Sequence, residues 1–137
     1  NGTTWNYMDE VHVVLADERT SGYSVDFWKR FRKYKGIPTG ITQNVQDLLS
    51  SPKIETILGN SDFIYLLNQA WEDKLILQKK LNISDYQAEY ITNSEEGEGL
   101  IVYDGEILPF KDKFPKNNSL YPVMTSKPEE LAAYRNQ

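Results

Sequence analysis

Two adjacent carboxylates, Asp9 and Glu10, follow a short and largely apolar run near the start of the chain. Residues 3–9 are typical of a buried strand, and open α/β folds bind ligands at the carboxyl edge of a parallel sheet. At that edge one carboxylate can hold Mg²⁺, directly or through water, and its neighbour can orient a water molecule that attacks a phosphate. The pair is therefore a candidate for a nucleotide-hydrolysis site, which further motifs have to support. The plainer alternative is an exposed acidic turn after a strand.

Gln43 lies at the next predicted strand-to-helix junction. Residues 37–42 form a poor strand on propensity, because a proline and a glycine both weaken it. If this strand runs parallel and adjacent to residues 3–9, Gln43 comes to lie beside Asp9 and Glu10, and the helix between the two strands has a normal length for such a crossover. A glutamine amide can donate to a phosphate and accept from a water molecule. The same segment is also an ordinary helix-capping sequence, and the motif alone leaves both interpretations open.

The clearest helix is predicted from Ser24 to Tyr34, with Ser24 as N-cap and Gly36 at the C-terminal cap position. Basic residues crowd its end: Lys29, Arg30, Arg32, Lys33 and Lys35. They complement the negative end of the helix dipole, as a solvated helix end does. Arg30 and Arg32 flank the aromatic stripe of this helix on opposite sides, so either is also a candidate arginine finger that reaches a neighbouring subunit.

The remaining patterns predict helices alternating with strands, followed by a hairpin at Asp104-Gly105. Strands separated by helices and then a hairpin indicate an α/β fold with a mainly parallel sheet, flanking helices and a C-terminal β-hairpin. The expected helices are 45–50, 53–58, 71–81, 84–91 (opened by a capping box at Ser84-Asp85-Tyr86-Gln87) and a last one from Pro128, and the expected strands are 62–67, 100–103 and 106–110. Residues 11–15 are apolar, and their pattern does not distinguish strand from helix.

Length and composition narrow the classes of function. A chain of 137 residues, taken as residues 1–137, fits one domain with one core. The net charge of −5 argues against broad nucleic-acid or membrane binding but permits a local basic patch. The absence of cysteine excludes disulfides and thiolate metal sites, and no apolar run approaches the ~18 residues of a membrane span. The chain begins Asn1-Gly2 without an initiator methionine, so we expect a fragment of a longer protein.

The order of the motifs is more specific than any one of them. The strand ending in Asp-Glu is followed by residues 29–37, 39–45, 58–69, 81–84, 97–101, 109–110 and 113–116. This ordered set, which covers nearly the whole chain, resembles the RecA-like core of the HerA/FtsK group of P-loop NTPases. Within that group it is most similar to the conjugative-transfer (type IV secretion) traffic ATPases.

The resemblance implies a role for each candidate residue. Asp9 and Glu10 would be the Walker B pair, with Asp9 serving Mg²⁺ through water and Glu10 polarising the attacking water. Gln43 would be the sensor glutamine after the next strand. Arg32 is the first candidate for a trans-acting arginine, and Arg30 is the second. The implied cofactors are ATP and Mg²⁺, bound by the full-length protein.

The resemblance also implies a setting. Such proteins act as homo-oligomeric motors, dimeric or hexameric, at the cytoplasmic face of a secretion channel, with channel proteins as partners and DNA or nucleoprotein as a candidate substrate. A P-loop, G-x-x-x-x-G-K followed by Ser or Thr, is required to cradle the phosphates, and this sequence contains none. In the family it lies upstream of Walker B. We therefore expect an ATPase as the parent protein and a fragment that is inactive alone.

Two alternatives belong to other classes of function. The first is a non-catalytic acidic α/β module that binds a protein partner through its aromatic surface, since the chain has nine Tyr, five Phe and three Trp. The second is a metal-dependent hydrolase that uses Asp9 and Glu10. No further ligand cluster accompanies that pair, and the single histidine, His12, cannot build a histidine-rich metal site alone.

Overall fold

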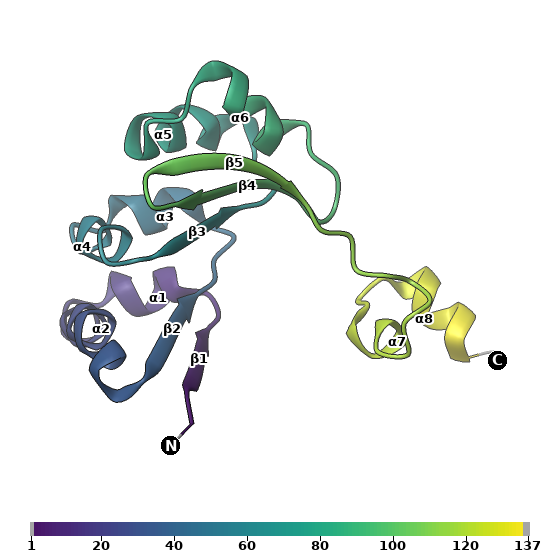
Figure 1. Ribbon diagram of the computed structural model, residues 1–137, viewed down its shortest axis with the longest axis horizontal. Coiled ribbons are helices and arrows are strands. Elements are labelled where there is room, and N and C mark those ends of the chain that lie inside the picture. The colour runs from purple at the N-terminus through teal and green to yellow at the C-terminus, as the bar shows by residue number, and fades with distance from the viewer. Residues whose placement is uncertain (1, 136–137) are drawn as a thin grey trace.

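The computed structural model describes residues 2–135, which form strands and helices in alternation (Figure 1). The strands are β1 (Thr4–Met8), β2 (Gly36–Gly40), β3 (Phe63–Leu66), β4 (Glu98–Tyr103) and β5 (Glu106–Lys111). The helices are α1 (Val11–Ala16), α2 (Glu18–Arg30), the 3₁₀ turn η1 (Phe31–Tyr34), α3 (Val45–Ser50), α4 (Ile54–Leu58), α5 (Trp71–Leu81), α6 (Asp85–Thr92), α7 (Tyr121–Met124) and α8 (Pro128–Arg135).

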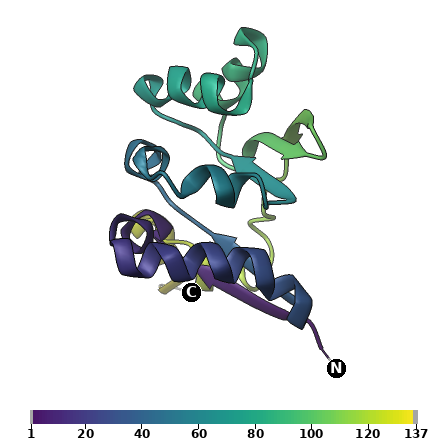
Figure 2. The ribbon, with the colours of Figure 1, turned by 90° about the vertical axis from the view of Figure 1, so that its left-hand side faces the viewer.

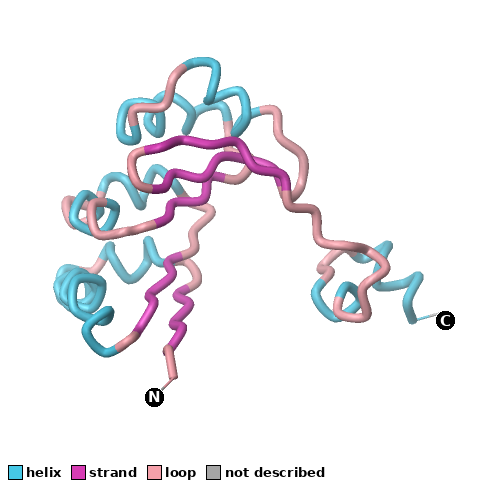
Figure 3. Tube along the Cα trace, viewed as in Figure 1, coloured by secondary structure: helices cyan, strands magenta, loops and turns pink. Residues whose placement is uncertain are grey.

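The strands follow one another along a curved layer, and helices α1 to α6 lie on one side of it (Figure 3). Seen from that side, α2 crosses in front of β1 and β2 (Figure 2). Helices α7 and α8 lie apart from the layer at the end of an extended segment (Figure 1). None of the helices within residues 2–135 combines the length and the apolar character needed to cross a membrane.

The α/β class is confirmed, but the parallel part of the sheet is smaller than predicted. Strands β1 and β2 pair in parallel, whereas β3, β4 and β5 form a separate antiparallel sheet. The connection from β3 to β4 holds the two predicted helices, α5 and α6, which pack against each other. The second helix brings the chain back to where β3 ends, and Gln69 N donates to Ile91 O at 2.6 Å there. Strand β4 therefore starts beside the end of β3 and runs antiparallel to it.

Two groups of buried apolar side chains hold the helices against the strands. One lies beneath α1, α2 and α4, and its members are Val11, Leu15, Trp28, Ile54 and Ile57. The other lies between α3, α5, α6 and the antiparallel sheet, and its members are Val45, Leu66, Leu77, Ile83, Ala88, Ile91 and Leu100. Leu49 of α3 packs against both groups, so the two cores are in contact.

The predicted start of the second helix is wrong. Helix α2 begins at Glu18, and its N-cap is Asp17, whose side chain accepts from Arg19 N at 2.9 Å and Thr20 N at 3.1 Å. Ser24 is buried in the middle of α2, where its hydroxyl donates to Thr20 O at 2.9 Å. A serine can satisfy its hydroxyl on the preceding turn as well as at a cap, and the sequence does not distinguish the two uses.

The predicted end of that helix is also different. The helix tightens into η1, and Lys35 takes the left-handed cap conformation at φ 57°. Gly36 is the first residue of β2, and the ring of Phe31 fills the space that a Cβ at Gly36 would occupy, 2.3 Å away. The glycine is therefore required by close packing of the ring on the strand. Strand β2 tolerates Pro38 because, of the described strands, only β1 pairs with it.

The other local predictions are confirmed within one or two residues. Helix α5 spans the predicted residues, and α6 opens with the capping box of Ser84 and Gln87. The hairpin turn forms at Asp104 and Gly105, which both have positive φ, as the tight turn of a two-residue hairpin requires. Residues 11–15 lie in helix α1.

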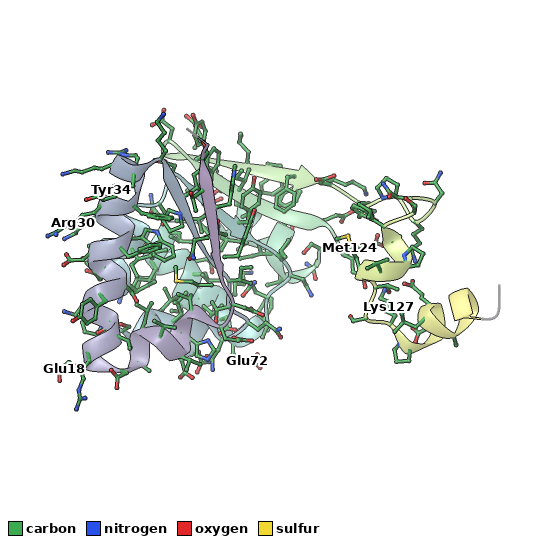
Figure 4. The ribbon with its side chains drawn as sticks, turned by 90° about the horizontal axis from the view of Figure 1, so that it is seen from below. Glu18, Arg30, Tyr34, Glu72, Met124 and Lys127 are labelled. Carbon is green, nitrogen blue, oxygen red and sulfur yellow. The ribbon has the colours of Figure 1, made fainter. Side chains whose placement is uncertain are left out.

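Glu130 of α8 organises the C-terminal segment. Its carboxylate accepts from Thr125 Oγ1 at 2.6 Å, Tyr121 Oη at 2.8 Å and Lys116 Nζ at 2.9 Å. These hydrogen bonds, with that of Thr125 the largest cause, lower the pKa of Glu130 from 4.5 to about 2. Lys127 links the segment to the main body through an ion pair with Glu96 at 2.5 Å, and Lys127 and Met124 are labelled in this segment in Figure 4.

The lowered pKa of Glu130 predicts acid sensitivity of the C-terminal segment. The folded pKa lies below the unfolded value, so Glu130 stabilises the segment fully above about pH 4.5 and loses this effect as the pH falls towards about 2. Side-chain NMR signals of Thr125 and Tyr121 should change over that range. Glu130→Gln should remove this change, and Glu129→Gln on the same helix should retain it. An identical profile for Glu130→Gln would contradict the assignment.

Candidate functional site

The carboxyl ends of β1 and β2 form one edge. The last residues of the two strands are paired in parallel register. Beyond them, Ile41 N donates to Met8 O at 2.8 Å and keeps the two chain segments together. Asp9 and Glu10 follow β1 at this edge, and Gln43 follows β2. The expected juxtaposition of the two strand-to-helix junctions is therefore present.

The turn at Asp9 and Glu10 is tight. Glu10 has a left-handed backbone, with φ 50° and ψ 45°, and Asp9 Oδ1 accepts from Glu10 N at 2.9 Å. A non-glycine residue in this conformation is uncommon, and such residues gather at functional sites. Glu10 is also the N-cap residue of α1, yet its carboxylate makes no capping hydrogen bond. The side chain is therefore held by other groups.

His12 holds that carboxylate and connects it to the second junction. Its Nδ1 lies 3.2 Å from Glu10 Oε2 and 2.8 Å from Thr42 Oγ1. Thr42 Oγ1 in turn accepts from Asn44 N at 3.1 Å. His12 was not predicted as a site residue, because one histidine cannot build a histidine-rich metal site alone. The signal in the sequence is the position of His12, two residues after Glu10 and, like Thr42, just beyond a strand end.

A shallow, open depression of about 500 Å³ lies at this edge. Its lining residues are Glu10, His12, Val13, Gln43, Asn44, Val45, Gln46 and Asp73. Glu10 and Gln43 thus share one surface, and Asp9 is exposed beside it without lining it. Asp73, from the first turn of α5, was not predicted, and its Oδ1 is buried without a hydrogen-bond partner in the described part of the chain.

The two candidate arginines lie at the other end of the parallel pair. Arg32 is in η1, which leads into the start of β2, and there Thr4 N donates to Lys35 O at 3.0 Å. Five-residue strands at about 3.3 Å per residue put roughly 13 Å between the two ends. Arg30 is exposed and lies 3.9 Å from Asp26. In Figure 4 Arg30 lies at the left edge of the molecule, and Glu72, the neighbour of Asp73, lies at the lower edge of the main body.

The donor groups at the edge can be compared with the needs of Mg²⁺ and nucleotide. Mg²⁺ is usually held by one or two carboxylates together with water and phosphate oxygens, so Asp9 fits a water-mediated contact even while Oδ1 holds the turn. Within residues 2–135 no group of three or more His, Cys, Asp or Glu side chains is arranged to hold a metal ion. The sequence supplies no P-loop, so this chain offers only part of a nucleotide site.

Two parallel strands that are each followed by a helix, with polar side chains at their common carboxyl edge, are compatible with the α/β domains that bind nucleotides. The chain belongs to the TraG P-loop domain family, whose model matches residues 5–121. The expected membership in the conjugative-transfer traffic ATPases is thereby confirmed.

The structure is similar to VirB4 of Thermoanaerobacter pseudethanolicus, with a TM-score of 0.74 and 27% sequence identity. The match covers 85% of this chain and 33% of the VirB4 chain, so this chain spans about a third of the length of the solved relative. No curated protein sequence matches the chain.

Proposed function

We propose that the chain is the C-terminal part of the ATPase motor domain of a conjugative DNA-transfer or type IV secretion protein. The observation that carries the proposal is the depression shared by Glu10 and Gln43 at the carboxyl edge of β1 and β2. Family membership and the likeness to VirB4 support it. The P-loop would be supplied from outside these 137 residues.

Each residue at the edge has a role in this proposal. Asp9 would hold Mg²⁺ through water, and the ion would supply positive charge against the phosphates. Glu10 would polarise the water molecule that attacks the terminal phosphate of ATP. Gln43 contacts that phosphate or the attacking water through its amide, and it can thereby sense whether the nucleotide is intact.

The proposed assembly is a homo-oligomer, hexameric or dimeric, at the cytoplasmic face of the membrane beside secretion-channel proteins. Arg30 and Arg32 support a multi-subunit site, because neither lies at the edge that carries Glu10 in its own chain. An arginine finger acts across a subunit interface in such an arrangement. DNA or nucleoprotein is the proposed transported substrate.

A protein-binding role also has support from one observation. The strand layer carries exposed aromatic residues at alternate positions, which lie on the same face of a strand. On β1 these are Trp5 and Tyr7, which are 59% and 64% exposed, and on β3 they are Phe63 and Tyr65, at 54% and 62%. Such a face is typical of a protein-interaction surface, and an ATPase motor can carry such a surface as well.

The missing P-loop predicts that residues 1–137 alone bind ATP·Mg²⁺ weakly or not at all, because the phosphate-binding amides and lysine are absent. Calorimetric titration of this chain should show no micromolar binding, whereas the full-length protein, with an upstream P-loop, should bind. Micromolar affinity of residues 1–137 for ATP would contradict the proposal. A full-length protein without a P-loop would favour the protein-binding role.

A further inference from the structure

The His12 imidazole contacts both junctions through one ring nitrogen. Nδ1 lies 3.2 Å from Glu10 Oε2 and 2.8 Å from Thr42 Oγ1. The His12 side chain is 16% exposed, so water competes little for these contacts, while the Glu10 side chain is 43% exposed. The histidine is therefore the more buried of the two partners.

The Glu10 carboxylate favours one tautomer of the His12 imidazole. A carboxylate oxygen accepts hydrogen bonds only, so a bare Nδ1 at 3.2 Å would set two lone pairs against each other. With the proton on Nδ1, the ring donates to Thr42 Oγ1 and is attracted to Glu10. Thr42 Oγ1 already accepts from Asn44 N at 3.1 Å, and a hydroxyl oxygen has two lone pairs for these two donors. The contacts favour the Nδ1–H form of His12.

We propose that His12 is a positioning residue that holds the Glu10 carboxylate and couples it to the segment carrying Gln43. The inference rests on the proposed function, in which Glu10 polarises water and Gln43 contacts phosphate. Gln43 lies between Thr42 and Asn44, which are the two residues tied to the imidazole directly and through Thr42 Oγ1. A shift of Gln43 towards phosphate would therefore move Thr42 and change the support of Glu10.

The structure also distinguishes this role from simple packing. A buried ring that only fills space would be replaced well by phenylalanine. A ring that acts through Nδ1 would be replaced better by asparagine, because Asn Nδ2 is bonded to Cγ as His Nδ1 is. Glutamine carries its amide nitrogen one atom further out, nearer the place of Nε2. The pair His12→Asn and His12→Gln is therefore a matched test of which nitrogen matters.

The kinetic test uses the full-length protein, with ATP as the substrate. We expect His12→Phe to lower kcat about 10–100-fold, as loss of a supporting hydrogen-bond partner does at other sites, and to leave KM within about twofold. His12→Asn should recover most of kcat, and His12→Gln should not. Wild-type kcat for His12→Phe, or equal kcat for the Asn and Gln variants, would overturn the proposal.

A spectroscopic test is independent of hydrolysis. His12 is the single histidine of the 137 residues, so its imidazole ¹⁵N signals are unambiguous in this chain. We expect the Nδ1–H form in the wild type and a shifted Asn44 amide signal in His12→Phe and in Thr42→Val. An Nε2–H form would overturn the proposal. If the Nδ1–H form is found and Glu10→Gln leaves hydrolysis unchanged, the coupling stands and the proposed function fails.

Discussion

Replacing Glu10 with glutamine in the full-length protein should leave ATP binding intact and slow hydrolysis by about 10²–10⁴-fold. The two side chains have nearly the same shape, so the amide oxygen can replace the carboxylate oxygen that lies 3.2 Å from His12 Nδ1. The substitution removes the negative charge that would polarise the attacking water. Steady-state ATPase assays and ATP titration of the same protein separate the two effects.

Glu18→Gln is a matched control for this substitution. Glu18 is an exposed glutamate in the first turn of the next helix, α2, and it does not line the depression. It should hydrolyse ATP at the wild-type rate. If the rate of Glu10→Gln lies within a factor of two of wild type, Glu10 is not the water-polarising residue, and the acidic-turn interpretation of Asp9 and Glu10 is favoured.

Replacing Arg32 with alanine in the full-length protein should reduce hydrolysis strongly with little loss of ATP affinity. Arginine fingers contribute about 10³–10⁵-fold to kcat in other nucleotide hydrolases. Arg32 is exposed in η1, roughly 13 Å of strand away from the edge that carries Gln43, so it can act only on the site of another subunit. The measurement is kcat and ATP affinity of the assembled protein.

Mixing variants tests the action across subunits. An Arg32→Ala subunit keeps Glu10, and a Glu10→Gln subunit keeps Arg32, so mixed assemblies should regain part of the activity that each variant lacks. Arg30→Ala tests the second candidate, two residues away. If Arg30→Ala abolishes hydrolysis while Arg32→Ala does not, the two were assigned the wrong way round. If neither changes the rate, the basic cluster is a solvated helix end.

Local sequence signals were sufficient wherever the deciding contacts lie within a few residues. The capping box at Ser84 and Gln87 fixes the start of α6 through bonds three residues apart, and Asp104-Gly105 adopts the turn that its own backbone freedom favours. The start of helix α2 was predicted wrongly, because Asp17 and Ser24 are both residue types that can cap a helix. Only the packing of the whole helix selects Asp17 as the N-cap.

The sequence by itself determined the α/β alternation, the family, and which residue types stand at the ends of β1 and β2. Only the tertiary structure decided which strands pair and which distant residues come into contact. It paired β3 with β4 antiparallel through a two-helix return, and it brought Asp73 from α5 to the depression beside Gln43. It also joined His12 to Thr42 across 30 positions. Such contacts depend on how strands and helices pack in space, and no periodicity or spacing within a single element encodes them.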